Sequence, residues 1–474
     1  MILREFWSKQ AMVSSRKRLF HKIRTFVMLS GLVFAMALSG LNLSSAALAA
    51  CVTSPKISAH TATAISPSGL SENLSPNIGQ IGALAPDPGK PSWDGADRAN
   101  DVKVLPNNLA VVAGKFTSYD WGGQSYVRNN LVIINTQTGE PTSIAPNING
   151  ELFTVELSCD GKSVYVGGNF NRVDGQVRNN AAQINIADGA LMPWNPNVDG
   201  SVQDIARIQR KVIIGGTFTT VGGQKKSVLA SVNATTGALT GWMNVRVTGA
   251  DPGGPKMVFN VVPSPDEKLM VITGNFYKAN GKSHPRMFVL GYNGTHPTLK
   301  KWYTPRTENP CSPKKDHEEL GVAFAPGSKA FYTVSTGGYS GNQNPAHDCD
   351  AAVKWPLSKA ALGSTKVKPL WINWNHGDSL SGVVATEKSV FIAGHNKYCK
   401  DKAGRGGTLL DRPGICELDA KTGAATQWHG TTSRQRSMHV RMALTPQGLI
   451  YVGDANKLNN QTGHNDLGLW LWAN

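Results

Sequence analysis

The sequence has little that would support helices or a familiar catalytic centre. Long amphipathic helical patterns are almost absent, and the usable apolar runs are about four to seven residues long, which is strand length. Charged residues make up only 17% and aromatic residues only 8% of the chain, against 50 glycines and 26 prolines. No HExxH, paired CxxC, GxSxG or phosphate-loop motif occurs. The sequence therefore predicts an all-β, turn-rich protein without a motif for these chemistries.

Residues 1–50 carry the features of an export signal. Basic residues within 16–24 precede an uncharged apolar stretch at 26–43, and residues 47–49 form a small-x-small cleavage motif. We therefore expect residues 1–50 to be a signal peptide. An uncleaved membrane anchor stays open, because an apolar run of about 18 residues nearly spans a bilayer.

Cys51 offers a second interpretation of the same region. Residues 48–51 read Leu-Ala-Ala-Cys and match a lipobox, in which the cysteine becomes a lipid-modified N-terminus. Lipidation would attach the protein to the outer face of the cell membrane, whereas ordinary cleavage would secrete it. Both interpretations predict an extracytoplasmic protein.

The charge of the exported part indicates what it attracts. The whole chain has a net charge of +16, and residues 1–50 hold seven Lys or Arg and one Glu, which leaves +10. A basic exported protein is drawn to anionic envelope polymers by long-range, salt-sensitive forces, although the charge also serves solubility. Nucleic acid is not an expected partner outside the cell. We expect a monomer and assign no cofactor.

A segment built around Gly-x-Phe recurs along the chain. Its clearest copies end at Phe116, Phe170, Phe218 and Phe276, and weaker copies lie at residues 332–337, 391–396 and 451–455, roughly 48 to 63 residues apart. Further strand-like runs flank each copy, and several units close on a turn led by Asn or Asp and followed by Trp, as at Asn233 and Trp242. Four strands per unit at this period predict the blades of a β-propeller.

The number of units predicts a seven-bladed β-propeller of four-stranded blades over residues 86–474, after a flexible linker at residues 51–85. The seventh unit ends in its third strand, near Trp472. The segment around Trp93 resembles the end of an earlier unit around Trp194. We therefore expect a strand near Trp93 to complete the last blade and close the ring, which removes open sheet edges.

The unit at residues 165–200, YVGGNFNRVDGQVRNNAAQINIADGALMPWNPNVDG, resembles the bacterial delta-60 propeller repeat. The resemblance is good over residues 100–300 and poor over residues 301–474, and it implies an exported bacterial propeller of a kind without an assigned activity. The Asp/Asn-x-x-Thr-Gly-x-x-x-x-Trp stretches also resemble the tryptophan-docking repeats of quinoprotein propellers. This second resemblance implies a fold only, and no quinone site is carried over from it.

Polar residues just before the predicted inner strands are the candidates for chemistry, because loops from all blades converge on one face of a propeller. Histidines beside carboxylates can bind a metal or act as general acids and bases. The weak catalytic candidates are His317, Glu318, His376, Asp378 and His439. The same residues also suit solvated polar loops, so we assign no metal site.

Two long loops are expected in the fifth and sixth units. Cysteines flank them, which predicts the disulfides Cys311–Cys349 and Cys399–Cys416. Aromatic and basic side chains near these loops are candidates for a ligand-binding surface. They are Tyr339, Trp374, Lys397, Tyr398, Lys400 and Arg405.

Together these features favour a binding or scaffold module at the cell surface or outside the cell, without catalysis. Its expected partner is an envelope protein, a glycan or an anionic envelope polymer. The alternative is an envelope hydrolase or lyase with a His/carboxylate site at the mouth of the channel. An enzyme of this kind requires His317, His376 and His439 to share one pocket.

Overall fold

The structure is a computed structural model of the 474-residue chain. Two compact units divide the chain into residues 1–54 and 55–474, and every residue described below belongs to the second unit. Strands account for 51% and helices for 2% of the structure, which confirms the predicted all-β class. No helix among the described residues is both long and apolar enough to cross a membrane. The structure describes residues 80–85, 98–208, 210–251, 254–292, 294–308, 311, 317–337, 347–404, 406–428, 440–445, 448–453, 457–458, 461–462 and 467–473.

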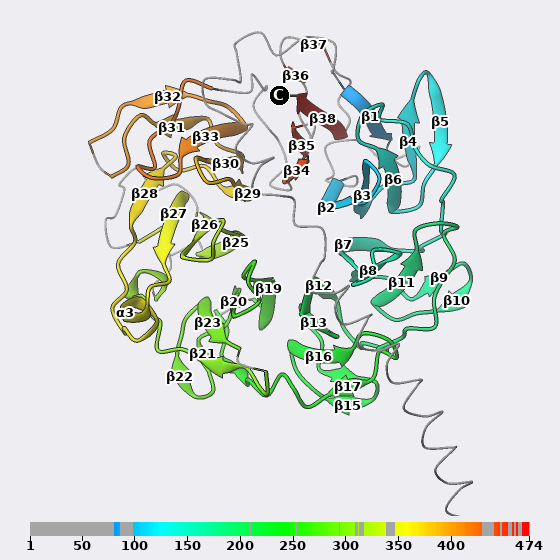
Figure 1. Cartoon of the computed structure of the whole chain (residues 1–474), viewed down its shortest axis with the longest axis horizontal. Coiled ribbons are helices and arrows are strands. Elements are labelled where there is room, and N and C mark those ends of the chain that lie inside the picture. The colour runs from blue at the N-terminus through cyan, green and yellow to red at the C-terminus, as the bar shows by residue number, and fades with distance from the viewer. Residues whose placement is uncertain are drawn as a thin grey trace, which may run out of the picture. The chain divides into compact units, whose positions relative to one another are not determined.

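Most strands belong to small antiparallel sheets that follow the order of the chain (Figure 1). The first three sheets are β2 (Arg98–Leu105), β3 (Leu109–Lys115) and β6 (Leu131–Asn135); β7 (Glu151–Leu157), β8 (Ser163–Asn169) and β11 (Ala181–Asn185); and β12 (Val202–Ile208), β13 (Lys211–Gly216), β16 (Leu229–Asn233) and β17 (Leu239–Thr240). The next three are β19 (Met257–Pro263), β20 (Leu269–Asn275), β23 (Met287–Gly291) and β24 (Thr298–Leu299); β25 (Glu318–Phe324), β26 (Ala330–Thr336), β27 (Ala351–Pro356) and β28 (Trp371–Trp374); and β29 (Leu380–Ala385), β30 (Ser389–Gly394) and β33 (Ile415–Asp419).

A further sheet combines both ends of the second unit. It contains, in order, β34 (Arg441–Thr445), β35 (Gly448–Gly453), β38 (Leu467–Ala473), β1 (Gln80–Ala85), β4 (Ser118–Trp121) and β5 (Gln124–Val127). Smaller hairpins are β9 (Arg172–Val173) with β10 (Gln176–Val177), β14 (Thr220–Val221) with β15 (Gln224–Lys225), β21 (Lys278–Ala279) with β22 (Lys282–Ser283) and the adjoining β18 (Val247–Thr248), β31 (Tyr398–Lys400) with β32 (Leu409–Asp411), and β36 (Lys457–Leu458) with β37 (Gln461–Thr462). Two short helical turns are η2 (Pro305–Thr307) and α3 (Lys359–Leu362).

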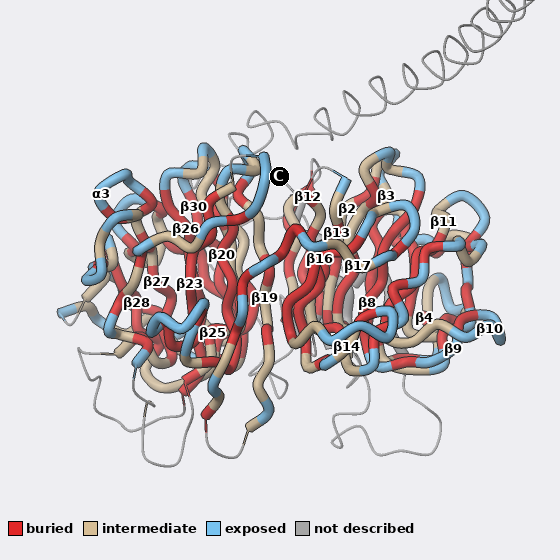
Figure 2. Tube along the Cα trace, turned by 90° about the horizontal axis from the view of Figure 1, so that it is seen from below, coloured by how far each residue is buried: buried red, intermediate tan, exposed pale blue. Residues whose placement is uncertain are grey.

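The second strand of each sheet explains the apolar runs in the sequence. β3, β8 and β20 are rich in β-branched residues and are buried at almost every position, on both faces. A strand has a continuous apolar sequence when other sheets cover both of its faces. Figure 2 shows the buried residues along the strands and the exposed residues mainly in the turns at their ends.

The repeat is visible in a bulge that recurs in the first strand of successive sheets. The pairing register shifts once in each of β2, β7, β12, β19, β25 and β29, always near the start of the strand. Such a bulge adds one residue, bends the strand and increases its twist. Repeated units in the sequence are therefore repeated units in space.

These first strands contact one another in the order of the chain: β2 with β7, β7 with β12, β12 with β19, β19 with β25, β25 with β29, β29 with β34, and β34 with β2. Polar side chains just after the bulge make some of these links. Asp101 Oδ2 accepts a hydrogen bond of 2.9 Å from the Val155 amide, and Asp204 Oδ2 accepts one of 2.6 Å from the Val261 amide. Gly321 holds the equivalent position in β25, where a Cβ would lie 2.7 Å from the Ser381 carbonyl oxygen. Backbone contact therefore replaces the side-chain link at that position.

Tryptophans connect several of the sheets to the next one. Trp194 is fully buried and donates a 2.9 Å hydrogen bond from its indole nitrogen to the Asn233 carbonyl, in the turn of the following sheet. Trp302 and Trp371 make the same kind of contact with the carbonyls of Pro356 and Ala420. Each ring buries a large apolar area while its one donor is satisfied, which favours tight packing between sheets.

The N-terminal strand that pairs with the end of the chain is β1. It pairs antiparallel with β38, with Leu84 opposite Leu467, and its other edge pairs with β4. Its residues come from the end of the segment expected to be a flexible linker, residues 51–85. Trp93, the residue around which we expected this strand, lies outside the described residues.

Candidate functional site

Two disulfides hold the long segments of the fifth and sixth sheets. Cys311 is bonded to Cys349 and Cys399 to Cys416, with Cα–Cα distances of 5.8 and 6.7 Å. This is the pairing predicted from the sequence, and disulfides of this kind indicate an oxidising, extracytoplasmic environment. Cys159 is also disulfide-bonded. The lipidation candidate Cys51 lies outside the described residues.

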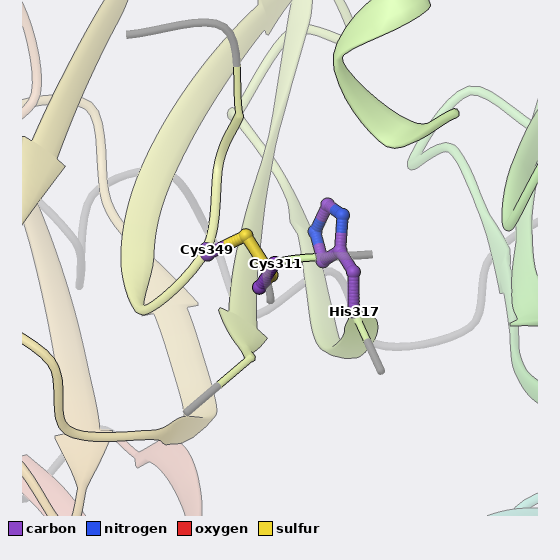
Figure 3. Close-up of side chains that lie close together, drawn as sticks. All are labelled: Cys311, His317 and Cys349. Carbon is purple, nitrogen blue, oxygen red and sulfur yellow. A yellow bond between two sulfur atoms is a disulfide. The ribbon is translucent and has the colours of Figure 1, made fainter. Parts of the chain in front are cut away.

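A buried polar cluster lies beside the first of these disulfides (Figure 3). His317 immediately precedes β25 and Glu319 is the second residue of this strand. His317 Nε2 lies 3.1 Å from Glu319 Oε1, and both side chains are 0% exposed. Neither ring nitrogen of His317 and neither carboxylate oxygen of Glu319 has a hydrogen-bond partner in good geometry. Glu319, rather than the sequence candidate Glu318, is therefore the carboxylate that pairs with this histidine.

Asp348 extends the cluster from the segment that precedes β27. Its side chain is fully buried and forms a close ion pair with Arg306, which also donates a 2.8 Å hydrogen bond to the His347 carbonyl. Burial raises the pKa of the Asp348 carboxyl to about 6, against the opposing effect of Arg306. Burial likewise lowers the pKa of the His347 imidazole. Asp348 was not among the candidates from the sequence. The one feature of the sequence that points to Asp348 is its position next to Cys349.

His376 and Asp378 belong to a second cluster, before β29. The His376 ring lies edge-on to Tyr398 at a centroid distance of 6.0 Å, and Asp378 Oδ2 accepts a 3.3 Å hydrogen bond from the Lys397 amide. His317 contacts Glu319 instead, and His439 lies outside the described residues. The structure thus brings together His376, Asp378, Lys397 and Tyr398, and places His317 in a different polar cluster.

Two of the proposed ligand-binding residues are buried. Trp374 is 7% and Lys400 is 3% exposed, and the Lys400 ammonium lies 6.0 Å from the Trp374 ring centroid. Burial lowers the pKa of Lys400, whose ammonium donates a 3.3 Å hydrogen bond to the Gly404 carbonyl. Both residues therefore pack the base of the β31–β32 segment. Lys397 is exposed and Tyr398 is half-buried, whereas Tyr339 and Arg405 lie outside the described residues.

A charged network on the first strands was not predicted from the sequence. Lys103 Nζ on β2 forms a 2.8 Å ion pair with Glu156 on β7. The Thr154 hydroxyl lies 3.3 Å from Asp101 Oδ2 and 3.2 Å from Asp204 Oδ1, so it links two carboxylates from different sheets. Burial raises the pKa of Asp204 to about 7 and also raises that of Asp101. These residues hold the inner strands together through polar side chains.

The raised pKa of Asp204 predicts that the protein loses stability as the pH rises. The folded state holds the Asp204 proton up to about pH 7, whereas an unfolded aspartate loses it near pH 4. Folding therefore favours the protonated group, and this contribution is lost as the pH rises through 7. We expect urea unfolding to give a free energy about 2–3 kcal/mol lower at pH 8 than at pH 5 from this group. Asp204→Asn should flatten the slope, and an unchanged slope would contradict the assignment.

Taken together, the described residues contain two polar clusters on the fifth and sixth sheets, one buried and one partly open. The buried cluster contains His317, Glu319 and Asp348, and the open one contains His376 and Lys397. No protein-family model and no curated protein matches the chain.

Proposed function

We propose that the second unit is a seven-bladed β-propeller of the bacterial delta-60 type, and that the protein is an exported binding or scaffold module for an anionic polymer of the cell envelope. The blade assignment is supported by the recurring bulge and by the succession of contacts from β2 to β34 and back to β2. The strand that closes the last blade in this proposal is β1.

The observation that carries the function is a set of exposed cations on equivalent hairpins. Each of these hairpins lies between the second and third strands of its sheet, so all of them belong to the same edge of the propeller. Their exposed basic residues are Arg172, Lys225, Lys278, Lys282, Lys397 and Lys402. The turns between first and second strands, at the opposite edge, carry charges of both signs, such as Asp266 beside Lys268. Asp174 and Asp411 are also exposed on these hairpins, so their exposed charges are six cations and two acids. A row in which cations predominate attracts a polyanion over several blades at once.

The enzyme alternative is less well supported. A hydrolase or lyase needs its histidine and carboxylate in contact with the substrate. His317 and Glu319 are both 0% exposed, so in this conformation no substrate reaches them. The exposed hairpins carry more cations than acids, which favours binding.

Removing four hairpin cations is expected to weaken binding to a soluble poly(glycerol phosphate) at least tenfold at low salt. The variant is Arg172→Gln, Lys225→Gln, Lys278→Gln and Lys282→Gln. Each lost cation removes an attraction that is long-ranged but screened by salt, so the difference should vanish at high ionic strength. Binding is measured by fluorescence anisotropy of the labelled polymer over a range of salt concentrations.

A matched control removes the same number of cations from the opposite edge. It carries Lys162→Gln, Arg210→Gln, Lys268→Gln and Lys329→Gln, one in each of four successive sheets. We expect its affinity to change less than twofold. Equal loss in both variants would show that only the net charge matters, and salt-independent binding would rule out this proposal in favour of a neutral glycan or a protein partner.

A further inference from the structure

We propose that the Cys311–Cys349 disulfide is a redox gate for a transition-metal site. When it is reduced, the two thiolates, the His317 imidazole and the Glu319 carboxylate bind one zinc ion. This inference does not depend on the proposed polymer binding.

The first argument is the placement of the ligand atoms. Cys311, Cys349 and His317 each offer one ligand atom, and these atoms all lie within 4.8 Å of one another, as Figure 3 shows. Zinc bonds to sulfur at about 2.3 Å and to nitrogen at about 2.0 Å, so tetrahedral ligands are about 3.3–3.8 Å apart. Two cysteines and a histidine are also the ligand types that select zinc over magnesium or calcium. Only small shifts separate the present arrangement from a coordination shell.

The second argument is independent of the cysteines. His317 and Glu319 are buried polar groups, and their nitrogens and oxygens have no hydrogen-bond partner in the described structure. A buried polar group left in this state costs about 1–3 kcal/mol. His317 Nε2 and Glu319 Oε1 are nevertheless 3.1 Å apart, close to the separation of two ligands on one zinc ion. A cation bound by His317 and the two cysteines would lie next to Glu319 and would satisfy both polar groups.

The third argument concerns space. Gly337 follows β26 and faces the disulfide, and a Cβ at this position would lie 2.0 Å from Cys311 Sγ and 2.9 Å from Cys349 Cβ. The sulfur atoms must move apart when the disulfide is reduced. Because residue 337 has no side chain, both cysteines can pack directly against its backbone, and no Cβ obstructs the sulfur atoms on this side.

The chemical step balances with a dithiol as reductant. The dithiol donates two electrons and two protons to the Cys311–Cys349 bond and becomes a cyclic disulfide, while the protein gains two thiols. Zinc then displaces both thiol protons, which pass to water, and neutral His317 and ionised Glu319 bind without further proton transfer. A small-molecule disulfide reverses the step: it accepts two electrons from the two thiolates and two protons from water and becomes two thiols, while the Cys311–Cys349 bond forms again and both Zn–S bonds are lost.

Access to a reductant distinguishes this disulfide from the one in the sixth sheet. Cys311 and Cys349 are both half-buried, whereas Cys399 and Cys416 are 0% exposed. The polar side chain near the second pair is Asn396, whose amide nitrogen lies 3.6 Å from Cys416 Sγ. The chain thus contains a built-in comparison: a disulfide beside a histidine, and a disulfide beside an amide.

The test measures metal binding to the full exported chain before and after mild reduction. Cobalt(II) is the probe, because thiolate ligands give it characteristic visible and near-ultraviolet absorption, and zinc then displaces it. We expect one equivalent per reduced chain and none per oxidised chain, with peptide mapping showing Cys311 and Cys349 free. His317→Gln should weaken zinc binding about 100-fold or more, and Glu319→Gln about 10–100-fold.

The control variant is Cys399→Ser with Cys416→Ser, which should bind metal as the parent chain does after reduction. Circular dichroism checks that each variant is folded before the titration. Retention of the cobalt spectrum in His317→Gln, or equal binding by oxidised and reduced protein, overturns the proposal. So does the absence of binding by a reduced, folded chain.

Discussion

Arg286→Met is expected to lower the free energy of unfolding by about 3–5 kcal/mol, because it leaves a buried carboxylate without its counter-ion. Arg286 and Asp251 are 1% and 6% exposed and form a bidentate pair with N–O distances of 2.6 and 2.7 Å. Arg286 also donates a 2.6 Å hydrogen bond to the Thr307 carbonyl, and Tyr277 donates one to Asp251. One substitution therefore removes the partner of Asp251, in the segment before β19, and of the Thr307 carbonyl, in η2. Equilibrium unfolding in urea measures the loss.

The controls for this prediction separate burial from charge. Lys268 and Asp266 form an exposed pair at 3.8 Å, with side chains 76% and 41% exposed. Lys268→Met should therefore change the free energy by no more than about 0.5 kcal/mol. The double variant Arg286→Met with Asp251→Leu should be more stable than Arg286→Met alone, because no isolated charge stays buried. If both single variants are equally mild, Arg286 does not neutralise a buried charge.

The repeats could be predicted from the sequence because each one combines three local signals. A continuous apolar run forms the second strand, an Asn or Asp starts the turn, and a tryptophan closes the unit, as Trp194 does. These signals depend on neighbours within about twenty residues. The disulfides could be predicted for a related reason, since the chain order places both members of each pair at one edge of their sheet.

The details of the polar cluster could not be predicted, because they depend on register. Glu318 and Glu319 are adjacent in β25, so they point to opposite faces of the strand. Which of the two contacts His317 depends on the pairing of β25 with β26, whose register shifts between Glu319 and Gly321. The register depends on contacts with another strand and cannot be predicted from the local sequence. The burial of Trp374 could not be predicted from the sequence either. Aromatic and basic residues in a loop-rich region suit a binding surface, but all four residues of β28 are buried.

The buried cluster belongs to the fifth sheet, whereas the exposed hairpin cations belong to the second, third, fourth and sixth sheets. The hairpin cations act through their charge at long range and tolerate substitution of their neighbours. His317, Glu319 and Asp348 are enclosed, so they act only through groups in direct contact, such as the disulfide or a metal ion. Reduction of the Cys311–Cys349 disulfide would change the buried cluster and leave the hairpin cations in place. Polymer binding and metal binding can therefore be tested separately in one chain.

Removal of residues 51–85 is expected to destabilise the whole second unit, because it deletes β1. This strand pairs with β38 at four positions and with β4 at three, so it joins strands from the two ends of the unit. Each backbone hydrogen bond contributes about 0.5–1.5 kcal/mol, so ladders with about one bond per paired position cost about 4–10 kcal/mol when lost. The edges of β38 and β4 would also be exposed, which favours aggregation. We expect a melting temperature lower by about 5–15 °C, measured by differential scanning calorimetry.

A chain that lacks only residues 51–79 is the matched comparison, since it keeps β1 and loses the segment before it. It should melt within about 2 °C of the parent chain, because no described strand is removed. The substitution Ala83→Pro should lower the melting temperature less than the deletion does. Residue 83 lies opposite both Gly468 and Asp120, and proline cannot donate a hydrogen bond to either neighbouring strand. If the chains starting at residues 80 and 86 melt at the same temperature, β1 does not hold these strands together, and the contact between β34 and β2 is sufficient.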